Sequence, residues 1–206
     1  MHTIERNVKE IYEYLMQTYH PLAMITYGSY SNHTNNLNSD YDAVLICSET
    51  ECFHDTNVIA NVRLDVWGYG KEWIESLTDY AKLIQIWDGR IVLDTDNIAE
   101  KLQKQVISYI ENCPKKTEEE KKDLKVWCEK MVERTYREDT EGMFRWHWLL
   151  VDSLEIYCDV RDLYYFGPKK TILRMKETDE IGYRLYDTAL RKQEELKAWI
   201  SYVFKE

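Results

Sequence analysis

The sequence predicts an α+β protein in which a mixed sheet flanked by helices is followed by an all-α helical bundle. Two observations predict this class. Short apolar or alternating runs, typical of strands, occur only between residues 22 and 93. Beyond residue 117, apolar residues recur with the helical period only. With 206 residues and a hydrophobic fraction of 44%, the chain can bury a core without disulfides or structural metal.

The first half alternates predicted helices with predicted strands. Apolar residues from Ile4 to Tyr19 share one helical face, and Pro21 then ends the helix. Asp88-Gly89 between two apolar runs is a signal for a β-hairpin turn. We therefore expect helices over 3–19, 71–82 and 97–111, strands over 22–27, 43–47 and 62–67, a hairpin across 84–93, and a polar loop without packed structure over 29–39.

A domain boundary is expected at Cys113-Pro114. Just beyond it, Thr117-Glu-Glu-Glu120 has the spacing of a capping box, which marks the start of a helix. The predicted domains are therefore 1–112 and 113–206. Within the second domain, Gly167-Pro168 breaks the helical pattern, and a last helix is expected over 179–204.

Charge and cysteine usage limit the class of partner. The formal net charge of −10 argues against a nucleic-acid-binding protein, because binding to a phosphate backbone needs a basic surface. A cationic partner fits this charge, and so does a purely solubilising role. Five cysteines without a C-x-x-C pair indicate a reducing compartment, and no apolar run approaches the length of a membrane span. We expect a cytoplasmic protein that binds neither nucleic acid nor membrane.

Three aspartates and a glycine–serine pair carry the candidate chemistry. Asp40 and Asp42 lie at the start of a predicted strand, where the two-residue period directs both side chains to one face. Asp65 lies on the polar face of the next predicted strand and can join them if the two strands are neighbours. Three carboxylates make a hard oxygen site suited to Mg²⁺ or Mn²⁺. Gly28-Ser29, directly after a predicted strand, could receive a phosphate.

This ordered set resembles the signature of the DNA polymerase beta-like nucleotidyltransferase superfamily. Within it, the chain looks most like the small bacterial enzymes typified by kanamycin nucleotidyltransferase, in which a minimal catalytic domain precedes a helical bundle. The resemblance covers residues 22–95, and the loop after Ser29 lacks the Arg found in many relatives.

The resemblance implies transfer of a nucleoside monophosphate from an NTP to a hydroxyl, with release of pyrophosphate. Two Mg²⁺ ions would be held by the three aspartates, with Asp65 holding only the catalytic ion. A glutamate of the helical domain would act as general base, and Glu133 in Glu133-x-x-x-Arg137 is the nearest match. The residues implied to bind the nucleotide are Gly28, Ser29 and Ser39.

Several alternatives stay open. An isolated Asp-x-Asp commonly caps a turn, and Glu133 with Arg137 could be an ordinary surface ion pair. The acceptor could be a small cationic molecule resembling an aminoglycoside antibiotic, which is the function we favour. It could instead be a protein that the enzyme AMPylates, or the chain could be a degenerate NTP-binding partner module. The sequence indicates no oligomeric state.

Overall fold

The computed structural model describes residues 2–49 and 51–205, with the backbone alone for residues 2–4. The chain divides into two compact units, Met1–Asn112 and Cys113–Glu206. The first contains a sheet with helices, and the second contains helices only in its described part. The α+β class with a mixed sheet followed by a helical region is therefore confirmed. None of the described helices is both long enough and apolar enough to cross a membrane.

The first unit is built on a mixed sheet. Parallel pairing of β2 with β5 lies at its centre, and the remaining strand pairs are antiparallel. The strand order is β3-β5-β2-β1-β6, with β4 paired to β5 beside this path. The described strands are β1 (Ala23–Tyr27), β2 (Tyr41–Cys47), β3 (Phe53–Asp55), β4 (Val58–Ile59), β5 (Val62–Gly70) and β6 (Arg90–Asp94).

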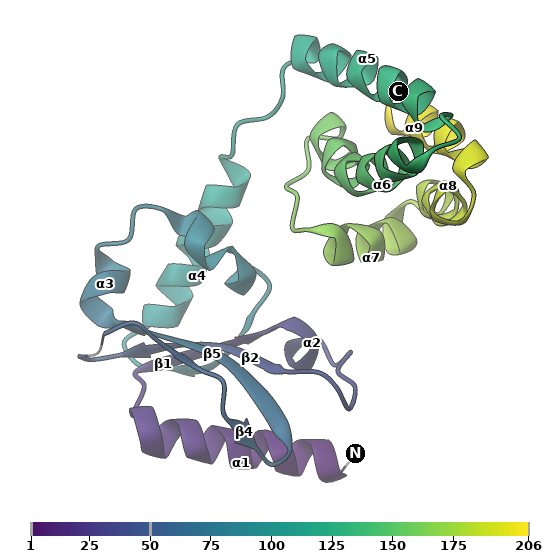
Figure 1. Ribbon diagram of the computed structural model, residues 1–206. Coiled ribbons are helices and arrows are strands. Elements are labelled where there is room, and N and C mark those ends of the chain that lie inside the picture. The colour runs from purple at the N-terminus through teal and green to yellow at the C-terminus, as the bar shows by residue number, and fades with distance from the viewer. Residues whose placement is uncertain (1, 50, 206) are drawn as a thin grey trace. The chain divides into compact units, whose positions relative to one another are not determined.

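Helices cover both faces of this sheet (Figure 1). On one face, α1 (His2–Tyr19) inserts Ile11 and Leu15 against alternate residues of β2 such as Leu45. On the other face, Val44 and Ile46 pack in a cluster with side chains from the remaining helical segments of the unit. These segments are α3 (Lys71–Glu75), the 3-10 helix η1 (Tyr80–Ile86) and α4 (Ile98–Glu111). Alternate side chains of β2 therefore belong to two separate hydrophobic cores, one on each face of the sheet.

Two sequence predictions for this unit are wrong, and tertiary packing accounts for the second. The helix expected over 71–82 splits into α3 and η1, and the hairpin across 84–93 does not form. Ile86 is fully buried at the end of η1, and the side chain of Gln103 donates to the carbonyls of Ile86 and Gly89 at 2.9 and 2.7 Å. As a result β6 pairs with β1 rather than with the segment before the turn.

The second unit begins with the predicted capping box. Thr117 accepts a hydrogen bond from the backbone of Glu120, whose side chain in turn accepts from the backbone of Thr117. The helix expected over 179–204 is interrupted at Lys192, whose extended backbone ends α8. The described helices are α5 (Glu118–Thr135), α6 (Thr140–Val160), α7 (Pro168–Thr178), α8 (Glu180–Arg191), η2 (Gln193–Glu195) and α9 (Leu196–Val203).

Asp179 joins three helices of the second unit. It caps the first turn of α8 by accepting from the backbone of Gly182, and it accepts from the hydroxyls of Tyr157 on α6 (2.7 Å) and Tyr202 on α9 (2.5 Å). Burial opposes ionisation of this carboxyl, but the hydrogen bonds from Tyr202, Gly182 and Tyr157 outweigh it and lower the pKa of Asp179.

We expect Asp179→Asn to remove an acid-dependent part of the stability of this unit. Because the pKa is lower in the folded state, the ionised carboxyl stabilises the fold above the ordinary pKa of Asp. This contribution of about 1–2 kcal/mol disappears as the pH falls below the ordinary pKa of Asp and through the lower pKa of the folded state. Asn keeps the cap, so urea unfolding should show a difference between variant and wild type at pH 6 that shrinks at a pH well below the ordinary pKa of Asp. An equal difference at both pH values would contradict the assignment.

Candidate active site

The parallel pairing of β2 with β5 brings two of the predicted aspartates together. Asp42 lies directly opposite Asp65 in the register, so their Cα atoms are about 4.8 Å apart and their side chains point to the same face. This is the face on which Val44 and Ile46 pack against η1 and α4. Asp42 and Asp65 are both partly exposed, at the point where that apolar cover ends.

Tyr27 lies on the other side of Asp42, at the end of the antiparallel strand β1. Burial raises the pKa of Tyr27, and the negative charges of Asp65 and Asp42 raise it further. The phenol therefore stays neutral and adds no third negative charge. Tyr27 was not among the residues predicted from the sequence, although its place as the last strand residue before Gly28 could have indicated it.

Gly28 allows the chain to pass close to the Asp42 carboxylate. Its φ of +67° is a left-handed conformation that favours glycine, and a Cβ there would lie 2.2 Å from Asp42 Oδ2. The residue begins one short helical turn, α2 (Gly28–Ser31), in which Ser29 is 9% exposed. The expectation of no packed structure over 29–39 is therefore wrong at its start. A nucleotide-binding role for Gly28 and Ser29 stays a prediction.

Asp40 and Ser39 precede β2 in the loop. Ser39 closes a turn, because its hydroxyl oxygen accepts from the backbone N–H of Asn36 at 2.9 Å and its own N–H donates to the Asn36 carbonyl at 3.1 Å. Burial raises the pKa of Tyr30, and the nearby negative charge of Asp40 raises it further. The roles of Asp40 and Ser39 in binding metal and nucleotide stay predictions.

His54 on β3 belongs to this site, although it was not among the residues predicted from the sequence. Its Nε2 lies 2.7 Å from Asp65 Oδ1, and its ring stacks on Trp67 of β5 with a centroid distance of 4.0 Å and an angle of 6°. His54 faces Trp67 in the antiparallel register of β3 with β5. No local spacing connects a histidine with a carboxylate eleven residues further on, so only the strand pairing reveals the contact.

The donor chemistry of the pair suits magnesium. Mg²⁺ prefers oxygen ligands and is commonly held by one or two carboxylates together with waters and substrate phosphates. Asp42 and Asp65 supply such a pair. Among residues 2–49 and 51–205, however, no group of three or more His, Cys, Asp or Glu side chains is arranged to hold a metal ion. The site with two ions and three aspartates therefore stays a prediction.

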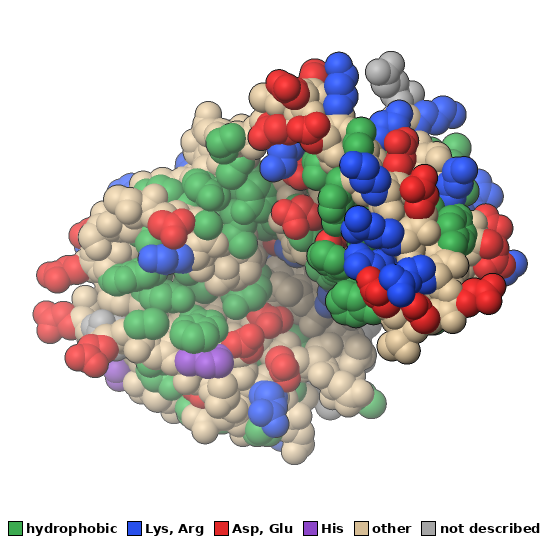
Figure 2. Space-filling view, turned by 45° about the horizontal axis from the view of Figure 1, so that its top comes forward, with side chains coloured by type: hydrophobic (Ala, Val, Ile, Leu, Met, Phe, Trp, Pro, Cys, Tyr) green, Lys and Arg blue, Asp and Glu red, His purple; other side chains and the backbone are tan. Residues whose placement is uncertain are grey.

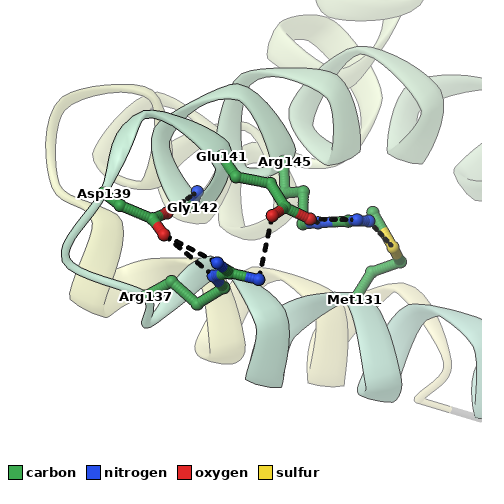
Figure 3. A network of polar contacts seen from close by, with 6 residues as sticks. All are labelled: Met131, Arg137, Asp139, Glu141, Gly142 and Arg145. Atoms are coloured by element: carbon green, nitrogen blue, oxygen red, sulfur yellow. Dashed lines mark hydrogen bonds and ion pairs between the residues drawn. The ribbon is translucent and has the colours of Figure 1, made fainter.

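Glu133 lies near the end of α5 in the second unit. The helix ends at Thr135, and Arg137 turns to the next helix instead, where it contacts Asp139 and Glu141 at 2.8 Å each (Figure 3). The alternative of a surface pair between Glu133 and Arg137 is therefore wrong. Glu133 borders a cavity of 390 Å³ between α5 and α9. Its role as general base stays a prediction.

No profile of a known protein family matches the chain, and no curated protein matches it. Among solved structures, the chain is similar to a nucleotidyltransferase-like protein from Exiguobacterium sibiricum 255-15, with 11% identity and a TM-score of 0.37. The alignment covers 98% of this chain and 74% of that chain. A likeness of this degree assigns neither fold nor function.

We expect Gly28→Ala to destabilise the first unit by about 2 kcal/mol, from backbone strain and from crowding of the Asp42 carboxylate. In an Asp42→Ala background the crowding is absent, so the same substitution should cost only about 1 kcal/mol. Amide hydrogen exchange in β2 measures the stability of this unit. If the substitution costs the same in both backgrounds, the close approach of Gly28 to Asp42 is not what requires glycine.

Proposed function

We propose that the chain is a nucleotidyltransferase that moves a nucleoside monophosphate from a Mg²⁺–NTP to a hydroxyl of a small cationic molecule. The observation that carries the proposal is the pairing of Asp42 with Asp65 on adjacent parallel strands, beside a glycine turn that approaches the Asp42 carboxylate. Two carboxylates side by side are costly without a cation, and magnesium with phosphates is the partner that this chemistry fits.

The reaction needs one bond to form and one to break. The acceptor oxygen bonds to the α-phosphorus, and the bond from this phosphorus to the oxygen that bridges to the β-phosphate breaks, so that pyrophosphate leaves. The proton of the acceptor hydroxyl passes to a general base, for which we propose Glu133. Two Mg²⁺ ions, or Mn²⁺, held by Asp40, Asp42 and Asp65 would supply positive charge at the α-phosphoryl oxygens and acidify the attacking hydroxyl.

The remaining residues of the site would orient the nucleotide and would add no further negative charge to the site. Gly28, Ser29 and Ser39 follow or precede the two central strands and would contact the phosphates. Tyr27 is held neutral by burial and by the charges of Asp65 and Asp42, so it does not compete with the carboxylates for a cation. The three strands β1, β2 and β5 therefore contribute to one surface.

The charge of the chain supports a cationic acceptor. The formal net charge is −10. On the face shown in Figure 2 basic and acidic side chains lie interspersed, so the support comes from the net charge and not from a single acidic patch on that face. An aminoglycoside-like antibiotic is an acceptor of this kind, and we propose that the helical unit binds it. Such an acceptor carries hydroxyls for the transfer and amines for attraction to an acidic protein.

We expect Asp42→Asn and Asp65→Asn each to abolish nucleotidyl transfer while leaving the metal-free melting temperature unchanged or higher. The physical reason is that either change relieves repulsion between neighbouring negative charges and also removes a cation ligand. Asp96→Asn, at an exposed position outside the site, is the matched control. Full activity in either site variant, measured as pyrophosphate release, would refute the proposal.

We also expect Mg²⁺–NTP to raise the melting temperature of the wild type and not of the two site variants. Incubation with each NTP and a panel of amino sugars, lincosamides and candidate proteins, followed by mass spectrometry, identifies the acceptor. A nucleotidyl adduct on an amino sugar supports the proposal, whereas an adduct found only on a protein indicates an AMPylating enzyme. A thermal shift without any adduct indicates a degenerate NTP-binding module.

A further inference from the structure

We propose that His54 is a positioning residue that fixes Asp65 by donating a hydrogen bond from Nε2 to Oδ1, so that Oδ2 is presented to the cation. The inference rests on the proposed function, in which Asp65 binds the catalytic ion. It assigns a task to a residue that lies outside the aspartate pattern and that reaches the site only through strand pairing.

The side chain of His54 is held in two directions. Stacking on Trp67, nearly parallel at 4.0 Å, fixes the plane of the imidazole ring. The contact of Nε2 with Asp65 Oδ1 at 2.7 Å fixes the direction in which the ring points within that plane. A carboxylate held by an oriented donor loses rotamer freedom, and such partners behind a ligand commonly change metal affinity by about 10–100-fold.

The strand that carries His54 is anchored from the opposite face. Phe53 lies against Gly68, where a Cβ would come within 2.0 Å of its ring, and it stacks on Tyr19 of α1 at 4.3 Å. Asp55 is only 4% exposed and accepts hydrogen bonds from the hydroxyls of Tyr14 and Tyr19 at 3.1 and 2.8 Å. Phe53 and Asp55 are thus both fixed by contacts on one face of the sheet. The side chain of His54, between them in the strand, therefore lies on the other face, which is the face of Asp65.

The contact between His54 and Asp65 adds little to the stability of the fold. The side chains of His54 and Asp65 are 36% and 43% exposed, and exposed ionic contacts contribute little to the free energy of unfolding. The effect of His54 should therefore lie mainly in the orientation of the Asp65 carboxylate. A positioning role and a structural role differ in what they predict for cation binding.

The test uses Mn²⁺ alone as the probe, measured by electron paramagnetic resonance on the full chain without NTP. We expect His54→Leu to weaken Mn²⁺ binding about tenfold or more. His54→Gln, which keeps an N–H donor, should stay within about threefold of the wild type, and turnover should follow the same order with the KM for NTP unchanged. His20→Asn, an exposed histidine at the end of α1 with a φ of 46° that Asn tolerates, is the control.

Asp65→Asn separates this inference from the proposed function. If Asp65→Asn loses Mn²⁺ and His54→Leu does not, the positioning role alone is wrong. If the wild type binds Mn²⁺ no better than Asp65→Asn, the proposed function fails together with the inference. If His54→Gln and His54→Leu lose the same amount of Mn²⁺ affinity while both still bind Mg²⁺, His54 is a direct ligand of Mn²⁺. That result would overturn the positioning role.

A measurement on the wild type guards against a variant that fails to fold. Histidine tautomers are distinguished by the nitrogen shifts of the ring in a long-range proton–nitrogen spectrum. At about pH 8, where an ordinary histidine is neutral, a donor to Asp65 requires the proton on Nε2. A proton on Nδ1 alone would overturn the proposal.

Discussion

The parallel register of β2 with β5 is the constraint on which the candidate site depends. It sets two aspartates directly opposite each other, an arrangement in which like charges repel. The register is nevertheless fixed, because Leu45 and Val66 are fully buried on the opposite face of the same strands. A slip of one residue would turn these side chains to the wrong face, so the buried core holds the charged pair in place.

The residues around Asp42 and Asp65 accommodate the two carboxylates in different ways. Gly28 leaves room for the Asp42 carboxylate, and Tyr27 remains neutral beside it because burial and both carboxylates raise its pKa. His54 engages Asp65 from the edge strand β3, which α1 anchors through Asp55. Packing on one face of the sheet thus controls side-chain positions on the other.

The fold was predictable where the pattern is local and strong. The apolar run before Gly28 became β1, and the capping box at Thr117 begins α5. Strand β3 was missed because Phe53, His54 and Asp55 show no strand pattern, and the contacts that hold them come from distant residues. The hairpin prediction failed because the Asp88-Gly89 signal is local, whereas burial of Ile86 and the contacts of Gln103 decide the conformation.

The sequence by itself determined the α+β class and the residue types that the candidate site offers, because periodicity and residue type are properties of short segments. Carboxylates near strand starts and a glycine after a strand can be recognised without knowing the fold. Only the tertiary structure decided that Asp42 faces Asp65, that His54 joins Asp65, and that Arg137 turns away from Glu133. These contacts depend on which strands pair and where a helix ends, and packing of distant side chains sets both.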